Sequence, residues 1–264
     1  MIARGLEKKK ALSLQMESTM RLNVPAVLAG DRIALPRASG FTLGRLGPSD
    51  YADLRNFRAE IVESIGNPDV IRLMPDEEQY VHECLDEKNF AVGLFDNKQL
   101  VAFNSLLWPS TDDELRELHI YEFVRSRALA STIAYAGGVM VHPSLRGRGF
   151  QKLLIEVRMV VTAHVGRPHH FSVVSFANVF SWRNILEMGG RVVGLFEFTD
   201  ARYGDTSRLF THQSPAPKPL SDHTIWVDSL DIEAQRRLLT DGLVGTEFRM
   251  LGAMAQLGYR HEIG

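Results

Sequence analysis

The sequence has little of several features that would narrow its class. Only one cysteine, Cys84, occurs in 264 residues, which excludes an intrachain disulfide and a cysteine-rich zinc site and suits a reducing compartment. The apolar runs are strand-sized and fall far short of the ~20 residues that a membrane-spanning helix needs. The 30 Lys and Arg are balanced by 32 Asp and Glu, so the basic surplus of a nucleic-acid binder is missing. We therefore expect a cytoplasmic protein with neither a nucleic-acid nor a membrane partner.

The length and composition favour one globular domain with extensions. The chain exceeds the roughly 100–200 residues of a typical domain, and its 45% hydrophobic residues suffice for a sizeable core. Regular alternation begins near Phe41, and the stretch from Ser214 to Pro219 has three prolines typical of a stiff linker. We expect an N-terminal arm over 1–38, a main domain over 39–213 and a C-terminal extension over 214–264. One or two helices are expected in the extension, at 232–239 and near 247–256.

Hydrophobic periodicity within the main domain predicts a mixture of strands and helices. Strands are expected over residues 41–46, 90–95, 100–103, 131–141, 171–176, 192–198 and 207–211. Helices are expected from about residues 51, 75, 149 and 178. The acidic stretch 109–118 predicts a solvated insertion. The alternative is an acidic rim that attracts a cationic amine.

The most informative stretch runs from Val139 to Gln151. A strand ends at His142-Pro143, and an Arg- and Gly-rich turn then opens an amphipathic helix. This order places backbone N–H groups at the positive end of a helix dipole, where a phosphate or diphosphate can bind. Glycines let the backbone approach such a ligand closely. The turn has neither the Gly-Lys-Ser/Thr ending of a P-loop nor the Gly-x-Gly-x-x-Gly pattern of a dinucleotide-binding fold.

This turn and a second motif resemble the GNAT superfamily of acyl-CoA-dependent N-acetyltransferases. The family's Arg/Gln-x-x-Gly-x-Gly/Ala turn reads Arg146-Gly147-Arg148-Gly149-Phe150-Gln151 here, with Gln in the last position. The stretch from Asn178 to Gly189 resembles the family's Asn-x-x-Ala/Ser helix. The resemblance implies an α/β (α+β) fold with a mixed, mostly antiparallel central sheet of about six to seven strands flanked by helices. It also implies a splay between the fourth and fifth strands of that sheet.

The resemblance also implies how acetyl-CoA would bind. The diphosphate would lie on the amides of Gly147, Arg148, Gly149, Phe150, Gln151 and Lys152, with charge from Arg146 and Arg148. The pantetheine arm would pair with the strand backbone of Val139, Met140 and Val141, as an added strand would. The Asn178 side chain would contact the cofactor, although Asn in this position also serves as a helix N-cap.

The catalytic residues are less clearly indicated. In many members of the family, a tyrosine seven residues after the motif Asn acts as the general acid, and this chain has Ile185 there. In other members a glutamate on the fourth strand acts as the general base, and this chain has Tyr135 there. Tyr135 is therefore the candidate acid, with a core aromatic as the alternative. Ser181 is a candidate for lining the thiol end of the cofactor. The alternative is an ordinary serine on the helix surface.

Other polar residues carry weaker indications. His142 is expected to be idle, Cys84 to be structural, and His169-His170 to lack the partners of a metal site. Tyr203 and Asp205 are placed near the acceptor entrance.

The sequence thus predicts direct transfer of an acetyl or short acyl group from coenzyme A to an amine of a small molecule or peptide, without a metal. The alternative is an acyl-CoA sensor or interaction protein with weak or no catalysis, favoured by the missing tyrosine and glutamate. A homodimer is one option for the assembly.

Overall fold

The computed structural model describes residues 22–35, 40–71, 76–200 and 204–263. The chain divides into two compact units. The first unit comprises Met1–Ser64, Asp76–Leu107 and Gly137–Gly166, and the second comprises Ile65–Pro75, Trp108–Ala136 and Arg167–Gly264. Strand β5 (Ile133–Val141) begins in the second unit and ends in the first. Among the described residues, no helix combines the length and the apolar character that a membrane crossing requires.

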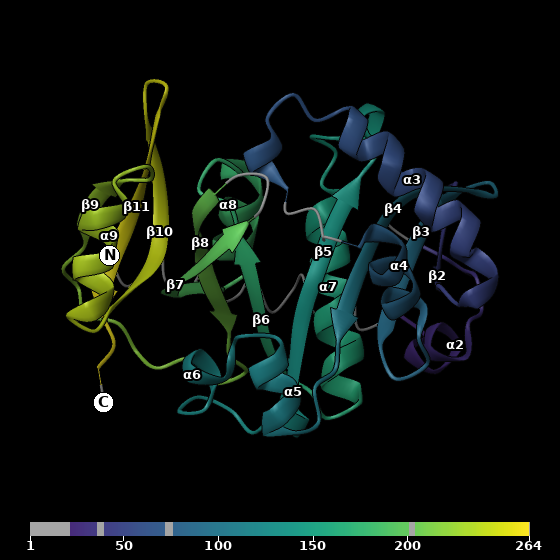
Figure 1. The fold of residues 1–264 in the computed structure, drawn as a ribbon, viewed down its shortest axis with the longest axis horizontal. Coiled ribbons are helices and arrows are strands. Elements are labelled where there is room, and N and C mark those ends of the chain that lie inside the picture. Colours follow the sequence, from purple (N-terminus) through teal and green to yellow (C-terminus); the bar gives the residue numbers. More distant parts are fainter. Residues whose placement is uncertain (1–21, 36–39, 72–75, 201–203, 264) are drawn as a thin grey trace. The chain divides into compact units, whose positions relative to one another are not determined.

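The strands of the first unit form an antiparallel series, β1-β2-β3-β4, continued by the C-terminal part of β5 (Figure 1). Their bounds are β1 Ile33–Ala34, β2 Phe41–Arg45, β3 Phe90–Asp96 and β4 Gln99–Leu107. The tight turn between β3 and β4 has Asn97 at φ 55°, a left-handed conformation that Asn tolerates. The hairpin expected from the sequence is therefore confirmed.

The four described α-helices of the first unit are α2 Val24–Ala29, α3 Tyr51–Glu63, α4 Glu77–Leu85 and α7 Phe150–His164. Two of them, α3 and α7, contact this sheet through aromatic side chains. Phe57 of α3 lies 6.1 Å from Phe103 of β4, ring centre to ring centre, and Phe150 of α7 lies 4.9 Å from Phe41 of β2. Asp76 caps α4 by accepting a hydrogen bond from the Gln79 amide, and the helix expected from about residue 75 is confirmed.

The described part of the expected N-terminal arm is folded into the first unit. Helix α2 is capped by Asn23, whose side chain accepts from the Ala26 amide, and Gly30 ends it at φ 91°. Val27 is fully buried, and Ile33 and Ala34 pair with β2. Residues 1–21 of the expected arm lie outside the described residues.

The strands of the second unit follow the order β5-β6-β8-β7-β10-β11-β9. Their bounds are β6 His169–Val174, β7 Arg191–Asp200, β8 Gly204–Gln213, β9 Ile225–Asp228, β10 Leu243–Leu251 and β11 Met254–His261. Strands β5 and β6 are parallel, whereas the pairs from β6 to β9 are antiparallel. A parallel pair needs a crossover connection, and α7 lies in the segment between β5 and β6.

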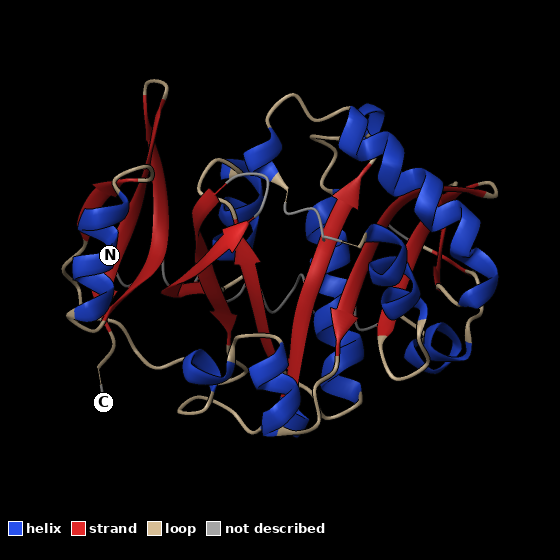
Figure 2. Cartoon of the chain, viewed as in Figure 1, coloured by secondary structure: helices blue, strands red, loops and turns tan. Residues whose placement is uncertain are grey.

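The second unit carries four described α-helices. Their bounds are α5 Asp112–Glu117, α6 Tyr121–Val124, α8 Val179–Glu187 and α9 Ile232–Thr240. Figure 2 shows the helices of the chain in blue and the strands in red. The acidic stretch is exposed as expected but forms helix α5 rather than an irregular insertion. Its Thr111 and Glu114 make a capping box, in which the Thr111 hydroxyl accepts from the Glu114 amide and the Glu114 carboxylate accepts from the Thr111 amide.

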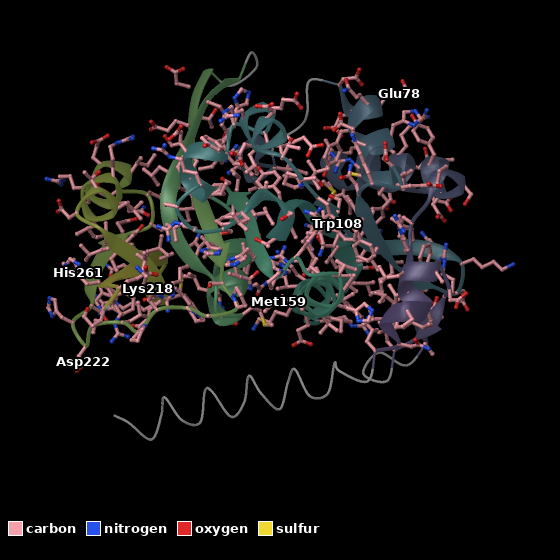
Figure 3. All side chains as sticks on the ribbon, turned by 90° about the horizontal axis from the view of Figure 1, so that it is seen from below. Glu78, Trp108, Met159, Lys218, Asp222 and His261 are labelled. Carbon is pink, nitrogen blue, oxygen red and sulfur yellow. The ribbon has the colours of Figure 1, made fainter. Side chains whose placement is uncertain are left out.

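The prediction of a helix near residues 247–256 is wrong. This stretch belongs to the hairpin of β10 and β11, with Gly252 at φ 61° in the turn. Gly242 at φ 80° separates α9 from β10, so glycines limit the strand at both ends. The segment before β9 lies along the end of β11, where the Ser221 amide donates to the His261 carbonyl over 2.9 Å. Figure 3 shows Lys218, Asp222 and His261 at this same end.

The described residues form eleven strands, more than the six to seven expected. The additional strands are β1 and the C-terminal β9, β10 and β11, which the sequence patterns did not reveal. The fourth and fifth expected strands correspond to β5 and β6. Their pairing covers Ile133↔His169 to Ala136↔Ser172, and β5 continues to Val141, while the splay between these strands stays a prediction.

Candidate functional site

The end of β5 is followed by a tight corner of the first unit, formed by residues 142–145. The His142 amide donates to the Val101 carbonyl of β4 over 2.9 Å, so the strand remains attached to the sheet up to this residue. Pro143–Leu145 forms a 3-10 turn in which the Leu145 amide donates to the His142 carbonyl over 2.9 Å. Leu145, the last residue of this turn, is buried. The strand–proline–turn order expected from the sequence is confirmed.

Two glycines then carry the chain from this corner into α7. Gly147 has φ 76° and Gly149 has φ 83°, a region of backbone conformation that residues with a Cβ rarely adopt. No heavy atom beyond the chain neighbours lies within 4 Å of an ideal Cβ at either position. Both residues are exposed. The backbone here can therefore be approached closely by a ligand.

The N-terminus of α7 follows directly. Gly149 is its N-cap, and the first intrahelical bond runs from the Leu153 amide to the Gly149 carbonyl over 3.0 Å. The earlier amides belong to the first turn, where an α-helix has no intrahelical acceptors and its dipole is positive. Arg146 and Arg148 are both exposed beside this turn. The Arg146–Gly149 turn thus offers the groups that an anionic diphosphate requires.

The C-terminal part of β5 leads into the same turn. Val139 and Val141 are half-buried, and Met140 is buried with its sulfur 4.0 Å from Nη1 of Arg58. All candidate diphosphate and pantetheine residues, from Val139 to Lys152, therefore form one continuous stretch of the first unit.

The remaining candidates belong to the second unit. Asn178 is the N-cap of α8, with its Oδ1 accepting from the Ser181 amide over 3.2 Å and its Nδ2 donating to the Val70 carbonyl over 3.3 Å. The capping alternative is thus confirmed, while cofactor contact stays a prediction. Ser181 is half-buried in the first turn of α8, and Tyr135 is buried on β5. Ile185, seven residues after Asn178, is buried as well.

The structure adds a polar cluster that the sequence analysis did not identify. The Tyr80 and Ser105 hydroxyls are 3.0 Å apart, and an ideal Cβ at Gly137 would lie 3.0 Å from each oxygen. The Arg58 guanidinium lies 4.3 Å from the Tyr80 ring centre and forms an ion pair with Glu77. Burial raises the pKa of Tyr80 far above its ordinary value, so its hydroxyl remains protonated. The Gly137-Gly138 pair was a signal for close backbone approach within a strand.

Cys84 is buried, and two histidines of β6 and β8 lie against each other. Burial raises the pKa of the Cys84 thiol, which disfavours the nucleophilic thiolate. His169 Nδ1 lies 3.1 Å from Nε2 of His212, an imidazole pair across β6 and β8. No group of three or more His, Cys, Asp or Glu among the described residues could hold a metal ion. Asp205 lies on β8, whereas Tyr203 is outside the described residues.

Comparison with known proteins shows similarity in structure rather than in sequence. No protein-family model and no curated protein matches the sequence. A GCN5-related N-acetyltransferase from Kribbella flavida is 17% identical, with a TM-score of 0.50 over 66% of this chain and 98% of that one. A protein from Staphylococcus epidermidis described as an acetyltransferase is 9% identical, with a TM-score of 0.51 over 67% of this chain and 99% of its own.

A third structure was solved with a ligand. It is a protein from Salmonella typhimurium described as an acetyltransferase, in complex with its cofactor acetyl-CoA. It is 15% identical, with a TM-score of 0.51 over 70% of this chain and 99% of that one. The chain therefore has the fold of the GNAT acetyltransferases.

Proposed function

We propose that this chain is an acetyltransferase that moves an acetyl or short acyl group from coenzyme A to an amine of a small molecule or peptide. Residues 39–213 would form the transferase domain. The observation that carries the proposal is the pair of exposed, positive-φ glycines, Gly147 and Gly149, at the N-terminus of α7. The Salmonella typhimurium protein of the same fold was solved with acetyl-CoA, which supports this choice of donor.

The binding roles follow the chemistry of each segment. The amides from Gly147 to Lys152 would donate to the diphosphate, and Arg146 and Arg148 would add positive charge beside it. The Val139–Val141 backbone would pair with the amide groups of pantetheine, in the way that a peptide adds to an open sheet edge. Asn178 would contribute a further polar contact.

The proposed chemistry requires control of protons. Bound acetyl-CoA supplies an activated acyl carbon and a thiolate leaving group. The acceptor must attack as the neutral amine, although an alkyl ammonium has a pKa of about 10.4, so a base or water chain must accept a proton. Tyr135 is our candidate donor to the departing sulfur, and Ser181 is our candidate for the polar contact near it. Backbone amides of β5 would polarise the acyl carbonyl.

Acyl transfer is tested by thiol release from acetyl-CoA in the presence of a panel of small amines and peptide N-termini. The proposal predicts amine-dependent release, reduced at least tenfold in Tyr135→Phe with little change in the KM for acetyl-CoA. Release at the wild-type rate in Tyr135→Phe would remove Tyr135 from the mechanism but leave the activity standing.

The second candidate is an acyl-CoA sensor without transfer. It is favoured by the buried Ile185, which cannot donate a proton where many relatives have a tyrosine. Tight acetyl-CoA binding with no turnover on any amine would support the sensor and contradict the transferase. Absence of acetyl-CoA binding would contradict both.

A further inference from the structure

A chain of hydrogen bonds connects α3 to the corner that precedes the Arg146–Gly149 turn. Glu60 Oε1 lies 2.9 Å from Nε2 of His142, and Nδ1 of the same ring lies 2.7 Å from the Ser144 hydroxyl. The Ser144 amide also points at Nδ1, over 3.3 Å. All three residues belong to the first unit.

The direction of these bonds follows from the amide. A backbone N–H can only donate, so Nδ1 of His142 must be the acceptor and carries no proton. The ring proton is then on Nε2, which donates to the Glu60 carboxylate. The Ser144 hydroxyl, 2.7 Å from Nδ1, faces the same lone pair, so the amide and the hydroxyl of Ser144 share it. Glu60 therefore selects one tautomer of His142, and that tautomer holds both polar hydrogens of Ser144.

A second contact lies one helical turn along α3. Ser64 donates its hydroxyl proton to the Ile61 carbonyl over 2.7 Å, which leaves its oxygen able to accept from Nη2 of Arg146 over 3.3 Å. Positions 60 and 64 share one face of the helix because they are four residues apart. The same helix face thus holds the corner at residue 142 and the turn at residue 146.

This support matters because the two glycines restrict the backbone of the turn less than other residues would. Gly147 and Gly149 have more backbone freedom than any other residue type, and no side chain caps α7 at Gly149. A flexible turn must lose that freedom on binding, and fixing it beforehand raises affinity. The contacts from α3 fix the residues immediately before the two glycines.

We propose that Glu60, His142 and Ser144, together with the Ser64–Arg146 contact, are positioning residues that preorganise the Arg146–Gly149 turn for the coenzyme A diphosphate. This inference rests on the proposed function. The group that this turn would hold is the diphosphate. The loss of affinity in a variant of these residues should therefore depend on whether the ligand carries a diphosphate. His142, which the sequence analysis expected to be idle, has a role through Glu60 and Ser144.

The matched variants all change α3. Glu60→Ala removes the acceptor for Nε2–H of His142, whereas Glu60→Gln keeps an oxygen in a similar place. Glu63→Ala alters an exposed carboxylate three residues further along the same helix and serves as the control. Because Glu60 is more than half exposed, each variant is expected to fold, which circular dichroism checks.

The experiment measures binding of acetyl-CoA and of S-acetylpantetheine, which lacks the diphosphate, by calorimetry. We expect Glu60→Ala to weaken acetyl-CoA binding 3- to 10-fold and to leave S-acetylpantetheine binding within twofold of wild type, with Glu60→Gln largely restored and Glu63→Ala unchanged. Equal loss for both ligands, or no loss for either, would overturn the inference while the proposed function stands. Failure of the wild-type protein to bind acetyl-CoA would overturn both, and the wild-type titration alone reveals that case.

Discussion

The Tyr80 hydroxyl lies 3.0 Å from the Ser105 hydroxyl, and both oxygens lie against the backbone of Gly137. A methyl group at Gly137 would meet both at 3.0 Å, closer than most packed side chains tolerate. We predict that Gly137→Ala destabilises the protein by about 1–3 kcal/mol, the usual cost of overpacking. Chemical denaturation measures this loss. Gly47→Ala, at a site with open space and φ −134°, is the control and should change stability little.

A Tyr80→Phe substitution tests whether crowding against the Tyr80 hydroxyl causes the loss of stability in Gly137→Ala. Tyr80→Phe removes one of the two crowding oxygens, so the double variant Gly137→Ala/Tyr80→Phe should lose less free energy of unfolding than the two single variants summed. Strictly additive losses would show that the Tyr80 hydroxyl does not oppose a side chain at Gly137.

The His169–His212 pair predicts a pH dependence of stability. Burial, together with the positive charges of His169, Arg127 and Arg191, lowers the pKa of His212 to about 3. In the unfolded chain its pKa returns to about 6.5, so the unfolded state binds more protons than the native state between those values. Stability from His212 is therefore present above about pH 6.5 and is lost as the pH falls towards 3. The loss amounts to about 2 kcal/mol at pH 5.

Substitution isolates this contribution. His212→Phe keeps an aromatic ring against Phe171, whose ring centre lies 4.2 Å away, but cannot be protonated. The difference in unfolding free energy between pH 7 and pH 5 should shrink in this variant, while the exposed His223→Gln should keep the wild-type difference. An unchanged difference in His212→Phe would contradict the assignment.

The C-terminal strands depend on a buried polar contact. Tyr259 is fully buried and donates its hydroxyl to Oε1 of Gln235 over 2.6 Å, and the Gln235 amide donates to the Ser229 carbonyl over 2.8 Å. Tyr259→Phe would leave the Gln235 oxygen buried without this donor. We predict a loss of about 1–3 kcal/mol in thermal or chemical unfolding. The half-buried Tyr121→Phe should lose less, and equal losses would argue against the contact.

Local features of the fold were predictable because a short stretch of sequence determines them. The turn from Arg146 to Gly149 could be identified because proline ends the strand and glycines precede an amphipathic helix. Helix α4 was found through the acidic residues after Asp76. The capping box of Thr111 and Glu114 was also visible in the sequence, but the run of charge suggested a loop instead.

Contacts between distant segments could not be predicted in this way. Arg58, Tyr80, Ser105 and Gly137 come from two helices and two strands, and only the sheet topology brings them together. The hairpin of β10 and β11 was mistaken for a helix because its pairing with β9 and its packing against α9 are contacts that the local residue pattern does not show. His142 looked idle because Glu60, its partner, lies 82 residues earlier.

The most direct test of the proposed cofactor site is a calorimetric titration of acetyl-CoA into wild-type protein, Gly149→Asn and Gly149→Asp. Asn and Asp have the same shape and both tolerate positive φ, so the comparison isolates a negative charge placed at the turn. We predict that wild type binds, that Gly149→Asn binds within about tenfold of wild type, and that Gly149→Asp loses at least about 100-fold through repulsion of the diphosphate. Equal affinity of Gly149→Asp and wild type would contradict the account, because the diphosphate could not then lie on these amides.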